Sequence, residues 1–503
     1  MLLKARLEHD TVYGRCLATS EAVERGELVV EELPFAYGPK RESGIVCLGC
    51  YRYLQFGEDG DSLDRCELCD WPLCGNCADD ASSDHRGECQ VFGTARVTFA
   101  GNVGEDGVCP QLDCITPLRV LLAKEAQPER WLNEVAPMEH HEEARRENAD
   151  IWHADRVNIA QYLRGPCKLA ERFSEELIMQ VVGVLEVNAF EARTINGYPL
   201  RCLYPYTGIL AHNCVPNTAR SIHPSEGYKV RLRAMVDLEA GQQLQHSYTY
   251  TLDGTVQRQA HLQQGKYFRC SCKRCLDASE LQTHFSSLKC GQCTEGWLLP
   301  KQPTALESSW QCNACDNTTS SQDVREIVEN LQAEVNGVQA LEMGAKRLEE
   351  SERLLRKYKS LLHPSHYIAT GLRQLLIEMY GRVQGYEMVQ LSDQLLERKS
   401  SLCRKVLRVL NVFEPGLSRS RAMNLYELHV PLVLLAKNGF IAGTLSGGEL
   451  RARLVDAIDL LKECVDILQH EDHDSQEGIL CGVAKQALEQ LTLSVEGLGS
   501  ELD

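Results

Sequence analysis

The stretch of sequence that decides the fold is Cys47-x2-Cys50-x15-Cys66-x2-Cys69-x4-Cys74-x2-Cys77-x7-His85-x3-Cys89. It holds eight side chains of the kinds that bind zinc, enough for two tetrahedral sites. A Cys-x2-Cys turn presents two sulfurs to one ion without backbone strain. Residues 47–89 are too few to make an apolar core, so we expect metal to organise them.

Two more cysteine groups follow. Cys270-x-Cys272-x2-Cys275 supplies three ligands and needs a fourth, for which the isolated Cys214 is the natural candidate. The last group, Cys290-x2-Cys293-x18-Cys312-x2-Cys315, is a closed set of four. The groups account for 15 of the 23 cysteines, so this spacing favours four metal sites over buried cysteines without metal.

Composition and charge narrow the class of protein. The 503 residues suggest three or four units, at roughly 100–200 residues per domain. A net charge of −18 should repel nucleic acid, so direct nucleic-acid binding is not expected and a basic or lysine-rich protein partner fits better. The first residues do not resemble a signal peptide. Because the sequence contains no long apolar run, we expect no membrane span. The cysteines therefore indicate metal sites in a reducing compartment, cytoplasm or nucleus, rather than disulfides.

Hydrophobic periodicity predicts both strands and helices. Residues 1–40 and 186–250 favour short strands, with Leu28 to Val30 buried and Tyr228 to Leu232 alternating. Residues 114–182 favour helices, and helical spacing returns after about residue 320. The later stripes are Val324, Ile327, Val328, Leu331, Val335 and Val338, then Leu454, Ile458, Leu461, Val465 and Leu468.

At this point the motifs resemble a known family. The first cysteine block resembles a MYND zinc finger, and residues 212–217, His-Asn-Cys-Val-Pro-Asn, resemble the Asn-His-x-Cys-x-Pro-Asn signature of SET methyltransferases. Residues 270–275 resemble the post-SET Cys-x-Cys-x2-Cys. In this order the motifs resemble the SMYD family, with this chain as a divergent member.

The resemblance implies an α+β fold in which a MYND finger splits a SET β-fold. The implied segments are 1–46 (first SET part), 47–89 (MYND finger), 90–185 (helical insert), 186–255 (SET core), 256–280 (post-SET), 281–320 (zinc-ribbon-like) and 321–503 (an all-α, TPR-like C-terminal domain). In MYND fingers the ligand pairs cross over. One zinc would take Cys47, Cys50, Cys74 and Cys77, and the next would take Cys66, Cys69, His85 and Cys89. A third would take Cys214, Cys270, Cys272 and Cys275, and the fourth set goes beyond the usual family plan.

The resemblance also implies an S-adenosylmethionine-dependent protein-lysine N-methyltransferase that acts on histone or other proteins, with a role in transcriptional regulation. Tyr248 takes the catalytic position beside the transferring methyl, with Tyr250 as the alternative. The matching cofactor-binding positions are Gly14, Arg15, Asn188, His212, Tyr248 and Phe268. A substrate protein with a target lysine is the implied partner.

Departures from the family pattern support a second hypothesis. Ala211 replaces the signature asparagine, and Cys16 stands where a second glycine is usual. Lys266 replaces an aromatic residue of the lysine channel, where its charge would repel a substrate ammonium; Tyr267 should point elsewhere if the segment is extended. The alternative is a catalytically weak or inactive adaptor that binds proline-rich partners or corepressors through the MYND finger.

Overall fold

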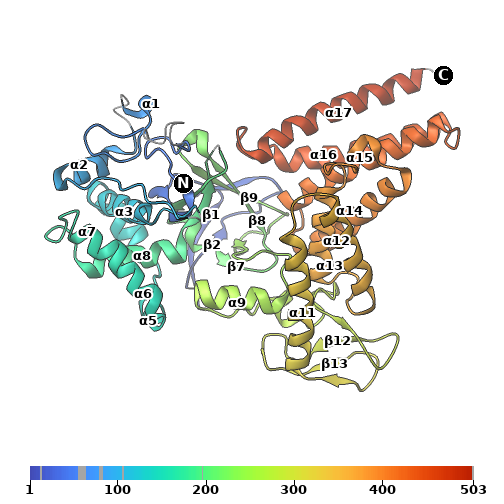
Figure 1. Ribbon diagram of the computed structural model, residues 1–503, viewed down its shortest axis with the longest axis horizontal. Coiled ribbons are helices and arrows are strands. Elements are labelled where there is room, and N and C mark those ends of the chain that lie inside the picture. Colours follow the sequence, from blue (N-terminus) through green and yellow to red (C-terminus); the bar gives the residue numbers. More distant parts are fainter. Residues whose placement is uncertain (12–13, 55–63, 79–82, 105–106, 195, 501–503) are drawn as a thin grey trace.

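The computed structural model describes residues 1–11, 14–54, 64–78, 83–104, 107–194 and 196–500. Figure 1 shows short strands at the centre, a helical region in cyan on one side and a larger helical region in orange and red on the other. The N-terminus lies at the centre and the C-terminus at the outer end of the last helix. This mixture of strands and helices agrees with the predicted α+β class. The predicted segments 1–46, 47–89, 90–185, 186–255 and 321–503 each include residues outside this description.

The central strands pair segments that lie far apart in the sequence. They are β3 (Leu28–Glu32), β4 (Ala36–Pro39), β5 (Phe190–Arg193), β6 (Pro199–Leu203), β8 (Thr218–His223) and β9 (Lys229–Ala234). β9 lies antiparallel between β3 and β8, and β6 lies antiparallel between β4 and β5. Two strands from before residue 40 are therefore completed by strands from after residue 189. The residues between them form an insertion in one strand region.

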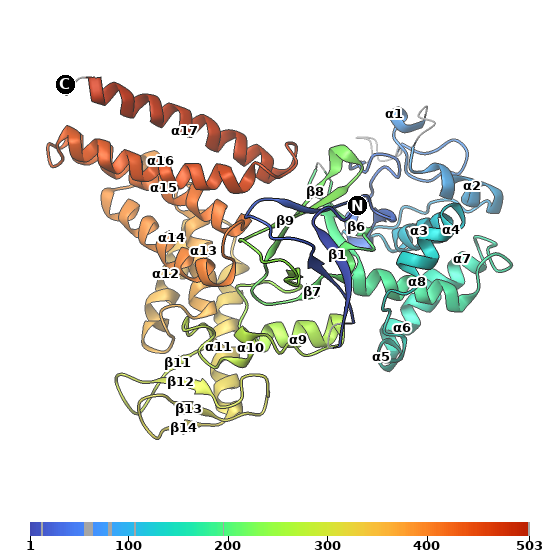
Figure 2. The same cartoon turned by 180° about the vertical axis from the view of Figure 1, so that it is seen from behind.

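Two smaller pairings complete the centre. β1 (Ala5–Asp10) and β2 (Gly14–Thr19) are antiparallel, whereas β7 (Ala211–His212) and β10 (Gln245–His246) are parallel. The parallel pair places the segment that follows His212 beside the segment that follows His246. His212 itself and the segment that follows His246 line the cavity described below. Figure 2 shows β7 from behind.

Side-chain alternation sets the face that β9 buries. Val230, Leu232 and Ala234 are fully buried, while the residues between them are half-buried. Arg231 lies on that outer face and binds Glu31 at 3.0 Å. Period-two alternation is expected of a strand with one covered face. The strand predicted from residues 228–232 is confirmed, as is the buried strand predicted at Leu28 to Val30.

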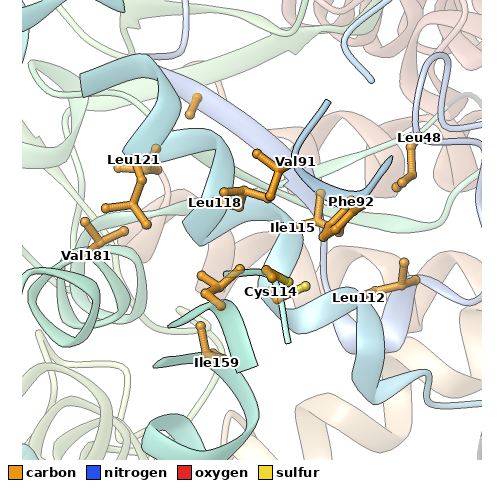
Figure 3. Close-up of a cluster of buried hydrophobic side chains, with 14 of the residues drawn as sticks. Leu48, Val91, Phe92, Leu112, Cys114, Ile115, Leu118, Leu121, Ile159 and Val181 are labelled. Carbon is orange, nitrogen blue, oxygen red and sulfur yellow. The ribbon is translucent and has the colours of Figure 1, made fainter. Parts of the chain in front are cut away.

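The insertion is mainly helical. Its helices are α1 (Gly75–Ala78), α2 (Arg86–Ala95), α3 (Ile115–Ala126), α4 (Pro128–Arg130), α5 (Glu142–Glu147), α6 (Ala149–Asp155), α7 (Tyr162–Arg164) and α8 (Glu175–Asn188). Figure 3 shows Leu118 and Leu121 of α3 among side chains from α2 and α8, with Phe92 and Val181 labelled. Phe92 stacks on the buried Trp71, with ring centroids 4.0 Å apart. This core joins the first cysteine block to the helices.

A buried ion pair crosses the same core. Arg119 of α3 donates from Nε to both carboxylate oxygens of Glu88 at 3.2 Å, and from Nη2 to the carbonyl of Leu48 at 2.7 Å. Burial alone would raise the pKa of Glu88, but the Arg119 charge beside it holds that pKa below its usual range. A buried charge is tolerated only when it is paired and hydrogen-bonded. Arg119 therefore ties α2 and α3 to the segment that carries Cys47 and Cys50.

A small antiparallel sheet follows the central strands. It is formed by β11 (Leu288–Lys289), β12 (Trp297–Pro300), β13 (Trp310–Cys312) and β14 (Thr318–Thr319), in chain order. Its buried side chains, Leu288, Leu298 and Trp310, share one core with Val324 and Leu331 of the next helix. The sheet carrying the fourth cysteine set is therefore packed on the C-terminal helices.

The chain is predominantly helical from Ser321 onward. These helices are α11 (Ser321–Gln339), α12 (Ala345–Lys357), α13 (Tyr367–Met379), α14 (Asp393–Phe413), α15 (Arg419–Ile441), α16 (Gly447–Leu468) and α17 (Gln476–Ser500). Serine residues cap four of them through side-chain bonds to backbone N–H groups, as N-caps do. The predicted stripe of α11 is buried at Val324, Leu331, Val335 and Val338. Ile327 lies in the same helix at the edge of that stripe and is 38% exposed.

The C-terminal helices dock closely on the central strands. The N–H of Leu417 donates to the carbonyl of Met235 at 3.1 Å, and Ser225 donates to Asp472 at 2.7 Å. Gly416 has a φ of +76°, and a Cβ there would lie 1.7 Å from the carbonyl oxygen of Met235. Only glycine allows this approach. Within the described residues, none of the helices has the length and apolar character needed to cross a membrane.

We predict that Arg119→Met strongly destabilises the protein. It leaves the buried Glu88 carboxylate without its partner, which typically costs about 3–5 kcal/mol. Arg172→Met is the matched control, because Arg172 pairs with Glu125 at the surface, where such pairs contribute about 1 kcal/mol or less. Urea denaturation of both variants measures the difference. Equal shifts in the unfolding midpoint would show that the buried pair has no special structural role.

Candidate functional site

The first cysteine block folds into two compact ligand groups. One contains Cys47, Cys50, Cys74 and Cys77, and the other contains Cys66, Cys69, His85 and Cys89; within each group the ligand atoms lie within 4.8 Å of one another. These are the crossed-over sets that the family resemblance implied. Sulfur atoms bound tetrahedrally at about 2.3 Å from zinc are about 3.8 Å apart. The Cys47–Cys74 and Cys66–Cys89 sulfur separations are both 3.6 Å, which suits one ion and is far too long for a disulfide.

His85 is oriented by its neighbours. Its Nε2 lies 3.2 Å from the sulfur of Cys69, and its Nδ1 lies 3.4 Å from a carboxylate oxygen of Glu88. Metal-binding histidines commonly donate their second ring nitrogen to a carboxylate in this way. Since Glu88 is also held by Arg119, the second ligand group is connected to the buried core of the insertion.

The third ligand group joins two distant segments. Cys214 follows β7, whereas Cys270, Cys272 and Cys275 lie between α9 (Thr255–Lys266) and the end of α10 (Lys273–Leu276). The Cys214 sulfur lies 3.5 Å from that of Cys275 and 3.9 Å from that of Cys270. The buried Arg258 donates from Nε to the Cys214 sulfur at 3.3 Å. A cation donating to sulfur stabilises the thiolate form that metals require.

The fourth group lies on the small sheet. Sulfur separations are 3.7 Å for both Cys290–Cys315 and Cys293–Cys312. Backbone N–H groups of Gln292 and Ala314 each point at a cysteine sulfur at 3.4 Å. The donor atoms and their spacing fit a tetrahedral zinc ion. The structure thus brings together all sixteen of the ligand residues that the sequence singled out.

A cavity of about 800 Å³ lies beside the third ligand group. Every residue that the sequence assigned to the cofactor lines it: Gly14, Arg15, Asn188, His212, Tyr248 and Phe268. These residues come from β2, α8, β7, the segment after β10 and the segment after α9. A concave site of this size, lined by rings and a few polar groups, suits a cofactor-sized ligand.

His212 connects the cavity to the ligand group. Its Nδ1 accepts a hydrogen bond from the backbone N–H of Tyr248 at 3.0 Å. Nε2 must therefore carry the ring proton, and it lies 3.3 Å from the Cys214 sulfur. Burial lowers the pKa of His212 to about 4, so the ring is neutral near pH 7. A histidine that could have been a simple core residue in fact bridges Cys214 and Tyr248.

Tyr248 is fixed at the cavity wall. Its hydroxyl donates to the carbonyl of Leu210, and its ring centroid lies 5.1 Å from His212 and 6.4 Å from Phe268. Burial raises the pKa of Tyr248 above its usual range, so the hydroxyl keeps its proton. Tyr250, the alternative, lines a different cavity and accepts a hydrogen bond from Gln374 at 2.9 Å. Of these two tyrosines, Tyr248 alone borders the cofactor-sized cavity.

The segment of residues 137–141 closes one side of the cavity, and sequence reasoning missed it. Arg15 donates to the carbonyl of Pro137 at 2.9 Å, and the amide nitrogen of Asn188 donates to the carbonyl of Glu139 at 2.7 Å. No motif marks this segment, because only the fold brings it here. The bond to Glu139 also limits what Asn188 can offer a ligand. Its Nδ2 already donates to the protein, so its Oδ1, which accepts no hydrogen bond from the described residues, is the side-chain atom left for a ligand.

Gly14 is needed for its backbone conformation. Its φ is +68°, a left-handed conformation that glycine adopts most easily, and a Cβ there would meet nothing within 4 Å. The side chain of Cys16 is buried in the central core and does not line the cavity. The substitution of glycine by cysteine at this position therefore leaves the cavity wall unchanged.

Lys266 does face the cavity, but the expectation of an extended segment was wrong. Lys266 is the last residue of α9, and Tyr267 ends the helix in a left-handed conformation at φ +61°. The Nζ of Lys266 donates to the carbonyl of Val187 at 2.5 Å and lies 5.6 Å from the ring centroid of Tyr248. Tyr267 contacts His141 instead, with ring centroids 5.1 Å apart. A cation therefore lies beside Tyr248, at the position where the sequence resemblance led us to expect an aromatic ring.

A second cavity, of about 370 Å³, lies between the central strands and the C-terminal helices. It shares Arg220, His246 and Ser247 with the first cavity. Its far side is formed by the turn before α15, which includes Glu414, by Arg419 at the start of α15, and by residues after α16, which include Glu471. The two cavities are therefore neighbours across one thin wall.

Comparisons with known proteins point to one family. No family model matches the chain. Among curated proteins, it is 30% identical over 320 residues to the SET domain-containing protein SmydA-8, isoform A, of Drosophila melanogaster, which covers 62% of this chain and 64% of that protein. It is 26% identical over 272 residues to the N-lysine methyltransferase SMYD2-B of Danio rerio, which covers 53% and 58%. It is 23% identical over 337 residues to the histone-lysine N-methyltransferase ASHR1 of Arabidopsis thaliana, and the match covers 63% of this chain and 65% of that protein.

The matches leave part of each relative uncovered. The chain spans slightly less than two thirds of the length of these curated relatives. Among solved structures, the SET domain of LSMT bound to lysine and AdoHcy aligns over 98% of this chain and 88% of that chain, with 11% identity. Its TM-score of 0.29 is too low to establish a shared fold.

We predict four zinc ions per chain, since each ligand group has four donors at tetrahedral spacing. Cys312→Ser should reduce the count to three, because the fourth group shares no ligand with the others. Elemental analysis of protein purified without added chelator measures both values. Cys403→Ser, which alters a buried cysteine of α14 outside the groups, is the control. A zinc content unchanged by Cys312→Ser would rule out the fourth site.

Proposed function

Because the chain is an SMYD-like protein, we propose that it is an S-adenosylmethionine-dependent protein-lysine N-methyltransferase. Its substrate would be a histone or another protein. One observation carries the proposal: the residues assigned to the cofactor come from five separate parts of the chain and line one cavity. Six residues chosen without regard to a common site would not be expected to line the same cavity. The names of the relatives, which include protein-lysine methyltransferases, support the same reaction.

The strand pairing supports a divided domain. We propose that residues 1–46 and 186–255 form a SET core, interrupted by a MYND finger at 47–89 and a helical insert at 90–185. Residues 256–280 would be the post-SET segment, 281–320 a zinc-ribbon-like unit, and 321–503 a TPR-like helical domain. Pairing of β3 with β9 and of β4 with β6 across the insertion supports this division.

The cavity residues fit the cofactor that the reaction needs. S-adenosylmethionine, when bound, would supply an electrophilic methyl group. The ring of Phe268 offers a flat apolar surface for the adenine, and the open backbone at Gly14 allows close approach. The Oδ1 of Asn188 is an acceptor for an ammonium group. The zinc ions would have a structural part only, because every group already has four protein ligands.

The chain's own residues would position the acceptor amine and exclude water. A free lysine has a pKa near about 10.4 and must lose its proton before it can attack. Desolvation in a closed cavity favours the neutral amine. Tyr248 is not the base, since burial raises the pKa of its hydroxyl and that hydroxyl already donates to Leu210. Its remaining lone pair, and the fixed carbonyl of Leu210, would orient the reacting groups.

A second function is favoured by the cations around Tyr248. Lys266 lies beside its ring, and Arg220 lies in the wall between the two cavities. Both would repel a lysine ammonium. The alternative is therefore an adaptor with weak or no transfer activity, in which the MYND finger binds proline-rich partners or corepressors. Under either function, clusters of cysteines that form no disulfide favour a reducing compartment, the cytoplasm or the nucleus.

We predict that Tyr248→Phe abolishes methyl transfer and preserves S-adenosylmethionine binding. The change removes the hydroxyl that orients the reacting groups and keeps the ring that packs against His212 and Phe268. Tyr250→Phe is the matched control and should retain activity, because Tyr250 borders the other cavity. Transfer of tritiated methyl to a protein array and calorimetry with the cofactor measure the two properties. Transfer that survives Tyr248→Phe would remove Tyr248 from the mechanism.

We predict that Lys266→Met raises the rate of transfer to lysine peptides. It removes a cation beside Tyr248, and a repulsion on the order of 1 kcal/mol corresponds to about fivefold in kcat/KM. Lys273→Met, on α10 outside the cavity lining, is the control. Steady-state kinetics measure the change. A decrease for Lys266→Met would mean instead that the Lys266 bond to Val187 is needed to shape the cavity.

A further inference from the structure

Arg220 occupies the wall that separates the two cavities. It lies on β8, and its side chain borders both of them together with His246 and Ser247. Its guanidinium packs over the ring of Phe190, with 5.0 Å from the central carbon to the ring centroid. A group that lies against this wall, in either cavity, is therefore close to the charge of Arg220.

Arg220 has no carboxylate partner in the part of the chain that the structure describes, although carboxylates are close. Glu471 is engaged by the Nε of Arg419 at 2.6 Å, and Glu414 accepts hydrogen bonds from the hydroxyls of Thr251 and Ser418. Arg419 also donates to the backbone carbonyl of Arg220 at 2.6 Å, which brings a second cation close. The acidic side chains of the second cavity are thus bonded to other groups. Arg220 interacts with the charge of Glu471 at longer range but forms no ion pair with either acid among the described residues.

The electrostatic environment makes this cation costly. Burial, and then the charge of Arg419, lower the pKa of Arg220 to about 10, so it stays protonated at neutral pH. The second cavity is lined by Arg220, Arg233 and Arg419 against the carboxylates of Glu414 and Glu471. The first cavity, across the shared wall, adds the cations Arg15, Lys266 and Arg269 against Glu139 and Glu191. A positive cavity wall is unusual in a protein of net charge −18. Such a site attracts an anion that brings its own hydrogen-bond acceptors.

We propose that Arg220 binds the side-chain carboxylate of an acidic residue in a peptide that enters the second cavity. A guanidinium matches a carboxylate in geometry as well as charge, through two parallel hydrogen bonds. The cavity volume of about 370 Å³ holds one or two side chains, so a short peptide segment fits and a globular surface does not.

The site has a consequence for substrate choice that rests on the proposed function. A target lysine approaching Tyr248 would meet the charge of Arg220. A carboxylate bound at Arg220 neutralises that charge before the lysine arrives. The substrate class is therefore a peptide with aspartate or glutamate next to the target lysine. The acidic residue acts first in binding and then in lowering the electrostatic barrier for the amine.

Binding of matched peptides tests the carboxylate site without any need for catalysis. The probes are two fluorescent nonapeptides, capped at both ends and identical except for Glu or Gln beside a single lysine. Fluorescence anisotropy with the full zinc-loaded chain should show about tenfold tighter binding of the Glu peptide, the size expected of a charge-assisted hydrogen bond. The preference should shrink as NaCl is raised. Equal affinity for the two peptides would overturn the proposal.

Variants of Arg220 locate the effect. Arg220→Met should abolish the preference for Glu, whereas Arg325→Met, on the exposed face of α11, should leave it intact. Arg220→Glu should reverse the preference toward a peptide with Arg at the same position, which a merely damaged fold cannot do. A Glu preference that persists in Arg220→Met would overturn the proposal. If Glu binding is confirmed but neither peptide is methylated, the carboxylate site stands and the proposed function fails.

Discussion

The grouping of Cys214 with Cys270, Cys272 and Cys275 is the constraint on which the candidate site depends. Its four sulfurs come from two segments that have no strand pairing with each other, yet all four ligand atoms lie within 4.8 Å. His212 precedes Cys214 by two residues, and Phe268 precedes Cys270 by two. One metal position would therefore set two walls of the cavity, and through His212 it would also fix the backbone of Tyr248.

A buried charge network extends that constraint to the C-terminal helices. Arg258 donates to the Cys214 sulfur and pairs with Glu280 at 3.1 Å, and Glu280 also binds Arg274. Arg274 donates to the carbonyl of Thr251 at 2.7 Å, three residues after Tyr248, and lies over the ring of Phe413 in α14. Each of these charges is acceptable in the interior only because its partners are present. Buried charges therefore connect the third cysteine group, the segment of Tyr248 to Thr251 and α14.

Much of the metal chemistry could be predicted from the sequence, because cysteine spacing is a local property. Only part of the cavity lining could be predicted from the sequence. Motif residues such as His212 carry a recognisable pattern, whereas Pro137 and Arg220 reach the cavity through tertiary folding and have no local signal. Lys266 shows the limit of reasoning from strand alternation. The sequence placed Lys266 at the cavity, but its side-chain direction is set by the end of helix α9, to which the alternation of side chains along a strand does not apply. Ile327 shows a related limit: helical spacing placed it correctly in a helix, but spacing does not say which edge of an apolar stripe a neighbouring element covers.

Calorimetric titration of S-adenosylmethionine into Cys275→Ser and Cys312→Ser tests the dependence of the cavity on the third cysteine group most directly. Cys275→Ser removes one of the four ligands of the third cysteine group, and Cys312→Ser removes one of the four ligands of the fourth. The account predicts that Cys312→Ser binds the cofactor as the unaltered protein does, while Cys275→Ser loses binding with its helical circular dichroism retained. Unchanged cofactor binding by Cys275→Ser would contradict it.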